Sequence, residues 1–411
     1  MAKRNPEEVF TPKTIVSREM FERRNEEDLD GVPGLQDSLR DALRERGGQV
    51  LLYGDTGVGK SSLLTYAAAD EKLGHVLVEC NSDMDYDRIL EFAIKEVVDV
   101  KELTRTRRVS GSMTGGVEGH PLPWIAKLTG SLRGEAGKET VFEVVEQDAL
   151  SVLTEAMAKS KKSLIVLDNF QNVPKEARER VAQGMESLSD RAGRHPDELD
   201  FKFVVIGIAS DAPSLLGSSR SYGRRTTEIG VPRMPDEEIA EILRRGFKIL
   251  KLSVNEEEIK RMVFYSDGFP YFAHLLGLQT ARAARRDSAS AINESMIKQA
   301  LIRASKAVSA SYPERVRFAH EAGGEVQPRK RILRLLANSN ARSWLSADVV
   351  EMWAKAHGKA ANYSFLHTAL SQLSQEKYGS ILIRSGIPRR YKFEFSDPHL
   401  RPYLRIIDSS V

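Results

Sequence analysis

The chain has 411 residues, of which 41% are hydrophobic and 29% charged, so it can fill ordinary hydrophobic cores and its length favours two or three domains. No apolar run approaches the roughly 20 residues that a membrane-spanning helix needs, and the first residues lack the apolar core of a secretory signal. The single cysteine, Cys80, excludes a framework of internal disulfides, and together these features predict a cytoplasmic protein without a membrane partner.

The formal net charge of +3 is unevenly distributed along the chain. Residues 325–411 contain 14 lysines and arginines against 7 aspartates and glutamates, whereas the rest of the chain is slightly acidic. A basic C-terminal part is compatible with binding nucleic acid or an acidic protein partner, without requiring either.

After an N-terminal segment, residues 1–30, apolar strand-like runs alternate with helical patterns as far as residue 233. The runs are continuous stretches rich in Val, Ile and Leu, which is typical of strands buried on both faces. This alternation predicts an α/β domain over residues 31–233, with helices on both faces of a parallel sheet. The expected strands are residues 50–53, 75–80, 163–168, 203–209 and 227–231.

The first of these runs leads into a glycine-rich loop and then into a helical pattern. Glycines let consecutive backbone N–H groups turn inward toward an anion, and the helix N-terminus adds a partial positive charge. This order predicts a P-loop that binds ATP, with Lys60 reaching the β- and γ-phosphates and the Ser61 hydroxyl binding Mg²⁺. The predicted nucleotide-binding residues of the loop are Gly54, Asp55, Thr56, Gly57, Val58, Gly59, Lys60, Ser61 and Ser62.

One segment, residues 105–140, interrupts the alternation and is rich in glycine and serine. Two interpretations of this insertion stay open. It is either a flexible surface loop or an element that contacts a neighbouring subunit, DNA or an effector protein.

A P-loop ATPase also needs an acidic residue at the end of a second strand to hold the water shell of Mg²⁺. Asp168 ends such an apolar run downstream of the loop, so we expect Asp168 and Ser61 to form the metal site. The next residue is Asn169, whose amide can orient water but cannot accept its proton as a carboxylate can. We therefore expect either slow hydrolysis or a base from elsewhere, with Asp55 and a residue of another subunit as candidates.

Polar and basic residues after the fourth expected strand are further candidates for a role in hydrolysis. Ser210 could hydrogen-bond the attacking water or the γ-phosphate as a sensor, or it could be an ordinary turn residue. Arg220, Arg224 and Arg225 follow, and any one of them could stabilise transition-state charge across a subunit interface or be a solvated surface arginine.

Two further domains are expected after the sheet. Residues 234–322 show helical patterns with acidic first turns, which predicts an all-helical lid. Residues 325–411 combine three helical patterns with two strand-like runs, which predicts a winged helix. Its third helix carries Ser, Thr, His and Gln, residue types that suit base contacts but also an ordinary solvated face. The wing residues suited to phosphate contact are Arg384, Arg389, Arg390 and Lys392.

Taken in order, these motifs resemble those of prokaryotic AAA+/STAND ATPases, which are related to the origin-recognition and helicase-loading ATPases. The resemblance includes residues 10–12 and 20–24, the P-loop, Asp168, and residues 268–271 and 395–404, and so covers nearly the whole chain. It implies that Pro270, in a Gly-x-Pro element of the lid, packs near the adenine, and that residues 10–16 cover the adenine. Residues 269–278 lack the arginine usual on this lid helix in AAA+ proteins, which moves the resemblance toward STAND switches.

The leading hypothesis is a switch that binds ATP and Mg²⁺, forms an ATP-dependent homo-oligomer and controls a separate partner or effector protein. Similar partnered ATPases occur in phage defence and in mobile elements. The alternative is an AAA+ ATPase of the loader or transposition-regulator kind that contacts duplex DNA through the winged helix. In many STAND proteins that domain instead packs against the nucleotide domain. A third hypothesis, which follows from Asn169, is a DNA-binding regulator that binds nucleotide without hydrolysing it.

Overall fold

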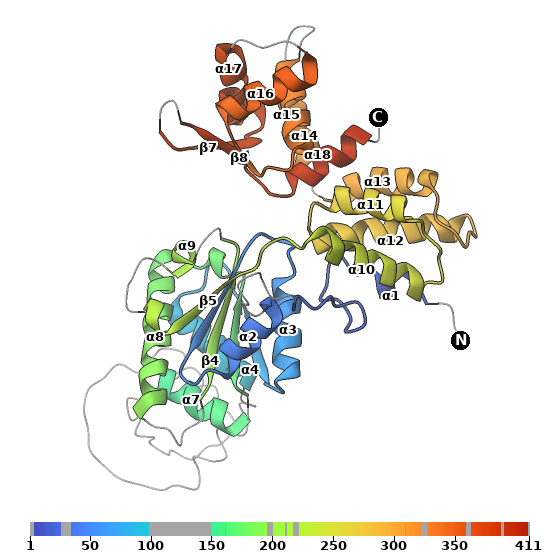
Figure 1. Ribbon diagram of the computed structural model, residues 1–411. Helices are drawn as coiled ribbons and strands as arrows, with labels where there is room; N and C mark the ends of the chain where they lie inside the picture. The colour runs from blue at the N-terminus through green and yellow to red at the C-terminus, as the bar shows by residue number, and fades with distance from the viewer. Residues whose placement is uncertain are drawn as a thin grey trace, which may run out of the picture. The chain divides into compact units, whose positions relative to one another are not determined.

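A computed structural model of the chain describes residues 4–25, 34–97, 149–160, 162–194, 200–209, 212–216, 222–308, 310–321, 327–358, 363–387 and 390–409. The chain divides into two compact units, whose helices and strands are labelled in Figure 1. The α/β unit comprises Arg23–Asp55 and Lys60–Pro232, and the helical unit comprises Met1–Glu22, Thr56–Gly59 and Arg233–Val411. The predicted insertion at residues 105–140 lies outside the described residues.

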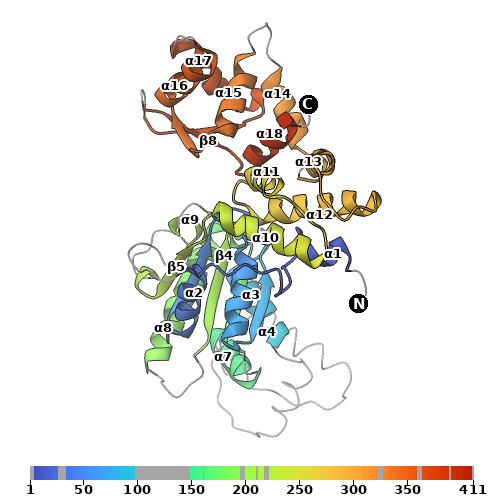
Figure 2. The ribbon, with the colours of Figure 1, turned by 45° about the vertical axis from the view of Figure 1, so that its right-hand side comes forward.

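The α/β unit is built around a five-stranded sheet in the order β2-β3-β4-β1-β5, in which every neighbouring pair is parallel (Figure 2). The strands are β1 (Gln49–Tyr53), β2 (His75–Glu79), β3 (Leu164–Asp168), β4 (Lys202–Gly207) and β5 (Thr226–Gly230). Strands β1, β3 and β4 are buried along almost their whole length, which explains why the sequence shows them as continuous apolar runs. The predicted parallel α/β sheet is confirmed, and its strands all end at the same edge.

Helices cover both faces of this sheet (Figure 1). On one face, α4 (Tyr86–Val97), α7 (Ala149–Ser160) and α8 (Lys175–Arg194) pack against strand residues such as Val78, Leu167 and Val205. The other face carries α2 (Leu35–Arg44) and α3 (Lys60–Asp70). The short elements of this unit are η1 (Phe170–Asn172), α9 (Pro213–Leu216) and η2 (Tyr222–Arg224).

The helical unit contains helices from residues 234–322, the segment predicted to be a lid and called the lid below, and a C-terminal module. The lid helices are α10 (Asp236–Ile249), α11 (Glu256–Ser266), α12 (Pro270–Arg286) and α13 (Glu294–Val308). The C-terminal module contains α14 (Tyr312–His320), α15 (Pro328–Asn338), β6 (Ser343–Leu345), α16 (Ser346–His357), α17 (Tyr363–Leu373), η3 (Glu376–Tyr378), β7 (Leu382–Ser385), β8 (Lys392–Phe395) and α18 (Leu400–Ser409). Its strands form an antiparallel sheet in the order β6-β8-β7. Within the described part of the chain, no helix has both the length and the apolar character needed to cross a membrane.

The N-terminal segment, with α1 (Pro6–Val9), is anchored on the lid. The ring of Phe10 is fully buried and packs against Gly246 and Gly277. A Cβ atom added to Gly246 or Gly277 would lie 2.2 or 2.4 Å from that ring, so only glycine leaves room for it. The Thr11 N–H donates to Nδ1 of His274 at 3.1 Å. These contacts attach the segment to α10 and α12, and its expected place over an adenine stays a prediction.

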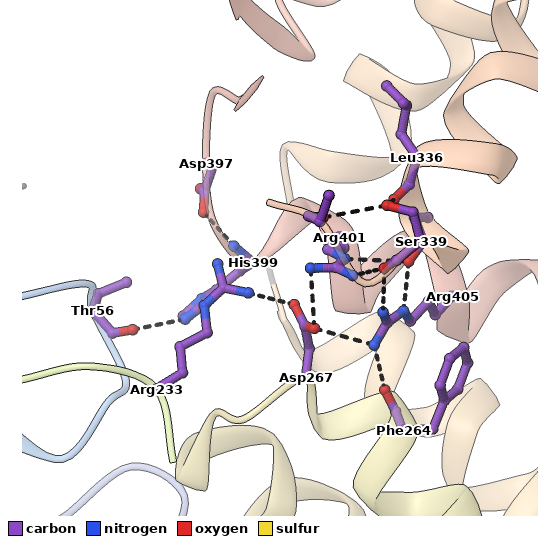
Figure 3. Close-up of polar contacts among 12 residues, drawn as sticks. Thr56, Arg233, Phe264, Asp267, Leu336, Ser339, Asp397, His399, Arg401 and Arg405 are labelled. Carbon is purple, nitrogen blue, oxygen red and sulfur yellow. Dashed lines mark hydrogen bonds and ion pairs between the residues drawn. The ribbon is translucent and has the colours of Figure 1, made fainter. Parts of the chain in front are cut away.

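A buried carboxylate joins the lid to the C-terminal module (Figure 3). Asp267 follows α11 in the left-handed conformation, with φ of 50°. Its Oδ2 accepts a hydrogen bond from Arg233 Nη1 at 2.5 Å, and its Oδ1 lies 3.1 Å from Arg405 Nη1 and 3.5 Å from Arg401 Nη1. All four side chains are less than a tenth exposed, so this is a buried network of charges.

The arginines of α18 also bind the backbone where other helices end. Arg401 and Arg405 both donate to the Ala337 carbonyl at the end of α15, at 3.2 and 2.6 Å. Arg405 Nη1 also donates to the Phe264 carbonyl in α11 at 2.6 Å. Burial lowers the pKa of Arg401 to about 10, while Asp267 acts to raise it. The positive charges are thus balanced by one carboxylate and by carbonyls that carry the negative end of helix dipoles.

Replacing the carboxylate of Asp267 should strongly destabilise the helical unit. Asp267→Asn keeps the shape but removes the carboxylate that three buried guanidinium groups share, which typically costs about 3 kcal/mol or more. The measurement is the free energy of unfolding from denaturant titration. The matched control is Glu257→Gln, which removes an exposed partner of Lys260 and should cost less than about 1 kcal/mol. A similar small loss for both variants would contradict this role of Asp267.

His274 should make the stability of the helical unit depend on acid pH. Burial lowers the pKa of His274 to about 4, whereas an unfolded chain binds its proton near pH 6.5. As pH falls below 6.5, the unfolded state gains a proton that the folded state excludes, so stability decreases down to the folded pKa. Between pH 7.5 and 5 this loss is about 2 kcal/mol. His274→Gln should lower that pH dependence of the unfolding free energy, and an unchanged dependence would assign it to other groups.

Candidate functional site

The glycine loop has the backbone that the sequence predicts for anion binding. It follows β1 directly, and α3 begins at Lys60. Gly54, Gly57 and Gly59 all have positive φ, of 146°, 75° and 96°. At Gly54 there is also no space for a side chain, because an added Cβ would lie 2.4 Å from the Val231 carbonyl oxygen. Such glycines allow the inward-turned N–H groups that bind phosphate.

Lys60 places a buried cation in this loop. Its side chain is only 9% exposed, and Nζ donates to the carbonyls of Gly54 and Asp55 at 2.9 and 2.8 Å. Burial lowers the pKa of Lys60 to about 8, and the nearby Asp168 and Asp55 carboxylates act in the opposite direction. The ammonium group therefore lies beside the loop backbone, where it can meet an anionic ligand.

Ser61 and Asp168 lie together as the sequence predicts. The Ser61 hydroxyl donates to Asp168 Oδ2 at 3.4 Å, which joins the start of α3 to the end of β3. A hydroxyl and a single carboxylate fit Mg²⁺, which keeps several waters and takes its other ligands from phosphates. The described residues contain no group of three or more His, Cys, Asp and Glu side chains that could hold a metal, so they offer no rival metal cage.

Asn169 turns the chain sharply after β3. It has φ of 57° in the left-handed region, and its N–H donates to Asp168 Oδ1 at 2.8 Å. Its side chain is exposed, whereas the following Phe170 is fully buried. Both Asp168 oxygens thus receive hydrogen bonds, one from Ser61 and one from this turn.

Two residues that the sequence did not single out bind the loop after β3 to the end of β4. Gln171 Oε1 accepts the N–H of Ile208 at 3.0 Å. Arg178, at the start of α8, donates to the carbonyls of Gln171 and Val173 at 2.8 and 2.6 Å and to that of Ser214 at 3.2 Å. Neither residue belongs to a sequence motif, so only the folded backbone reveals them.

The tip of the glycine loop, Thr56–Gly59, belongs to the helical unit. The Thr56 carbonyl accepts a hydrogen bond from His399 Nε2 at 3.0 Å (Figure 3). The His399 ring stacks on Tyr271 with a centroid distance of 5.5 Å. A Cβ added to Gly59 would lie 3.7 Å from Pro270, which the sequence predicts to be near the adenine. The tip therefore contacts both the lid and the residue before α18.

Of the remaining predicted residues, the two that the structure describes do not lie at this edge of the sheet. Ser210 and Arg220 lie outside the described residues. Arg224 is exposed at the end of η2, and Arg225 binds Asp190 at 2.6 Å. The Arg225 carbonyl accepts the N–H of Gln49 at the start of β1, so it lies at the opposite edge of the sheet from the loop.

Several polar residues of the predicted DNA-contacting face have partners inside the C-terminal module. On α17, Gln372 accepts a hydrogen bond from Arg329 at 2.9 Å, and His367 Nδ1 lies 3.2 Å from the Ser346 hydroxyl. In the sheet, Lys392 pairs with Glu394 at 2.7 Å. Of the predicted wing arginines, Arg384 and Arg390 are exposed, and Arg389 lies outside the described residues. The Arg384 guanidinium lies 4.5 Å from the Tyr391 ring centre.

Comparison with known proteins agrees with this geometry. Residues 32–201 match the family described as an AAA ATPase domain. Among solved structures, a Walker-type ATPase of Pyrococcus abyssi is similar over 94% of this chain and 99% of its own, with 18% identity and a TM-score of 0.51. The Aeropyrum pernix ORC2 protein, solved as ADPNP–ADP complexes, is similar over 96% of this chain and 97% of its own, with 16% identity and a TM-score of 0.46. The Aeropyrum pernix ORC1 protein in complex with DNA has 13% identity and a TM-score of 0.44 over 99% of this chain and 98% of its own.

No curated protein matches the chain. The matched family segment nevertheless contains the glycine loop, Lys60, Ser61 and Asp168, whose geometry is that of a P-loop. Residues 32–201 of this chain thus match an AAA ATPase domain and have the fold and loop geometry of a P-loop protein.

Proposed function

We propose that the chain is a nucleotide-dependent switch that binds ATP with Mg²⁺ in the glycine loop and hydrolyses it slowly. This proposal rests on the observation that the residues of the glycine loop contact two different sets of residues. Lys60 and Ser61 begin α3 beside Asp168, whereas the Thr56 carbonyl at the tip accepts a hydrogen bond from His399. A ligand that reshapes the loop therefore acts on the lid and the C-terminal module as well.

The residues of the site suit phosphoryl transfer from ATP to water. Lys60 would neutralise charge on the β- and γ-phosphates, and the N–H groups of the loop would bind their oxygens. Ser61 and Asp168 would hold Mg²⁺, which supplies charge neutralisation and positioning of the phosphates when bound. Because Asn169 cannot take a proton from water, the expected hydrolysis is slow unless another residue acts as the base.

The output of this switch is proposed to be ATP-dependent self-association that controls a separate partner or effector protein. Phage defence and mobile elements are the settings in which similar ATPases work with partners. Nucleotide would act by fixing the loop tip against Tyr271 and His399, which changes the surfaces that the helical unit offers to other chains.

A second candidate function, DNA contact by an AAA+ ATPase of the loader or transposition-regulator kind, is favoured by one observation. The C-terminal module is basic overall, and its predicted winged helix exposes Arg384 and Arg390. One similar structure is described as an ORC1 protein in complex with DNA. Phosphate contacts of this kind would make binding weaken steeply with salt.

Removing the Lys60 charge should strongly weaken nucleotide binding. In Lys60→Ala the phosphates lose a charged donor worth about 1.5–3 kcal/mol per hydrogen bond, so the affinity for ATP should fall by about 100-fold. Isothermal titration calorimetry with ATP and Mg²⁺ gives this affinity. Lys175→Ala is the matched control, because Lys175 is exposed at the start of α8. Equal affinities for the two variants would contradict the assigned site.

The switch predicts a particle mass that depends on nucleotide. Light scattering should give a larger mass with ATP than with ADP, and Asp168→Ala should lose this difference because its metal ligand is missing. A mass that is the same with ADP, with ATP and with ATP plus duplex DNA would contradict both candidate functions. An increase that requires DNA, together with DNA-stimulated phosphate release and a salt-sensitive complex, would favour the second candidate.

A further inference from the structure

ATP hydrolysis needs a group that accepts a proton from the attacking water, and the residue after Asp168 cannot do so. The amide of Asn169 has no basic group, and its backbone turns away in the left-handed conformation. A base would have to come from elsewhere, either from another residue near the carboxyl edge of the sheet or from another subunit. The assignment of a base rests on the proposed hydrolysis, and the question is which residue of this chain takes the proton.

Strand register brings one glutamate beside Asp168. In the parallel pair of β2 and β3, Glu79 is the direct partner of Asp168, and both are the last residues of their strands. Neighbouring strands lie about 4.8 Å apart, so the two Cα atoms are adjacent. The next N–H of the β2 chain, that of Cys80, donates to the Asp168 carbonyl at 2.9 Å, which fixes this register at the edge.

The two carboxylates also project from the same face of the sheet. Val78 and Leu167, the residues before them, are both part of the buried cluster under α4, α7 and α8. Because side chains alternate along a strand, Glu79 and Asp168 project to the opposite face. That is the face of α3, where the Ser61 hydroxyl already donates to Asp168.

Other described carboxylates near this edge have different roles. Asp85 accepts the N–H of Arg88 at 2.8 Å at the start of α4, and Asp83 Oδ1 lies 3.4 Å from the Ser82 hydroxyl in an exposed turn. Asp55, which the sequence suggests as a base, lies beside Lys60 and acts to raise its pKa, as a counter-ion does. Glu79 is exposed, so it can exchange a proton with solvent between turnovers.

Folding alone does not explain this pair. Like charges directly opposite on adjacent strands are destabilising, and the exposed position of Glu79 would accept a neutral polar residue at no cost to the core. A second carboxylate beside Asp168 would have a role in hydrolysis if Mg²⁺ and a water molecule lay between the two carboxylates and the γ-phosphate.

We propose that Glu79 is the general base of ATP hydrolysis in this chain. The carboxylate of Glu79 takes a proton from a water molecule as the water oxygen forms a bond to the γ-phosphorus. The bond between that phosphorus and the β,γ-bridging oxygen breaks, and ADP leaves with the electron pair. The proton then passes from Glu79 to solvent or to the released phosphate, which restores the carboxylate for the next turnover.

Glu79→Gln tests this assignment, because it keeps the size of the side chain and removes only its basicity. General-base catalysis is typically worth 10²–10⁴-fold, so kcat for phosphate release should fall by about 100-fold or more. The affinity for ATP and Mg²⁺, measured by calorimetry, should stay within about threefold of wild type, since Lys60 and Ser61 are unchanged. Glu79→Asp should retain part of the rate.

The matched control is Asp83→Asn, which removes an exposed carboxylate four positions away and should leave kcat unchanged. A Glu79→Gln chain that hydrolyses ATP at nearly the wild-type rate would overturn this assignment while leaving the proposed function intact. Loss of ATP affinity in Glu79→Gln would also overturn it, because Glu79 would then be a binding residue. A wild-type chain that binds ATP but releases no phosphate would overturn the proposed hydrolysis together with its base.

Discussion

The parallel direction of all five strands is the constraint on which the site depends. In a parallel sheet every strand ends at the same edge, so the loop after β1, the end of β2 and the end of β3 meet there although they are far apart in the chain. The register then decides which side chains are neighbours. A shift of β2 by one residue would turn Glu79 to the other face and break the hydrophobic cluster that contains Val78. Packing of the hydrophobic core therefore fixes which polar side chains are neighbours at the carboxyl edge of the sheet.

A different kind of constraint holds the helical unit together. Asp267 is one carboxylate facing three arginines from two parts of the chain, and its left-handed backbone directs it out of the end of α11. An apolar contact would tolerate sliding, whereas a buried ion pair has few acceptable geometries because any misplacement leaves a charge without a partner. The residues after Asp267 lead directly into Pro270 and α12. The network thus sets the position of the segment that contacts the loop tip.

Much of the fold and of the candidate site could be predicted from the sequence. The other contacts could not be predicted, for a physical reason. The strands, the glycine loop, Lys60, Ser61 and Asp168 are encoded by local patterns, namely apolar runs, glycine spacing and an acid at the end of a strand. The contacts of Asp267, Gln171 and Arg178 link residues whose types occur everywhere in proteins, so no local pattern marks them. Glu79 is the sharpest case, because its significance lies in its register with Asp168. The sequence suggested Asp55 in the loop or a residue of another subunit instead.

The geometry of the loop supports coupling between binding and movement through a single peptide group. The N–H and C=O bonds of a trans peptide point in opposite directions, so where an N–H of the loop turns inward toward an anion, the carbonyl of the same peptide turns outward. The Thr56 carbonyl points outward in this way and accepts the His399 N–H. In the proposed switch, an anion that orders an inward N–H would therefore also fix the carbonyl of the same peptide. The His399 ring stacks on Tyr271, and the backbone N–H of His399 donates to Asp397 Oδ1 at 2.9 Å, so the loop tip contacts a residue that is itself held by two neighbours. The proposed switch would therefore need no long-range pathway, because the N–H that would bind phosphate and the carbonyl that contacts His399 belong to the same peptide group.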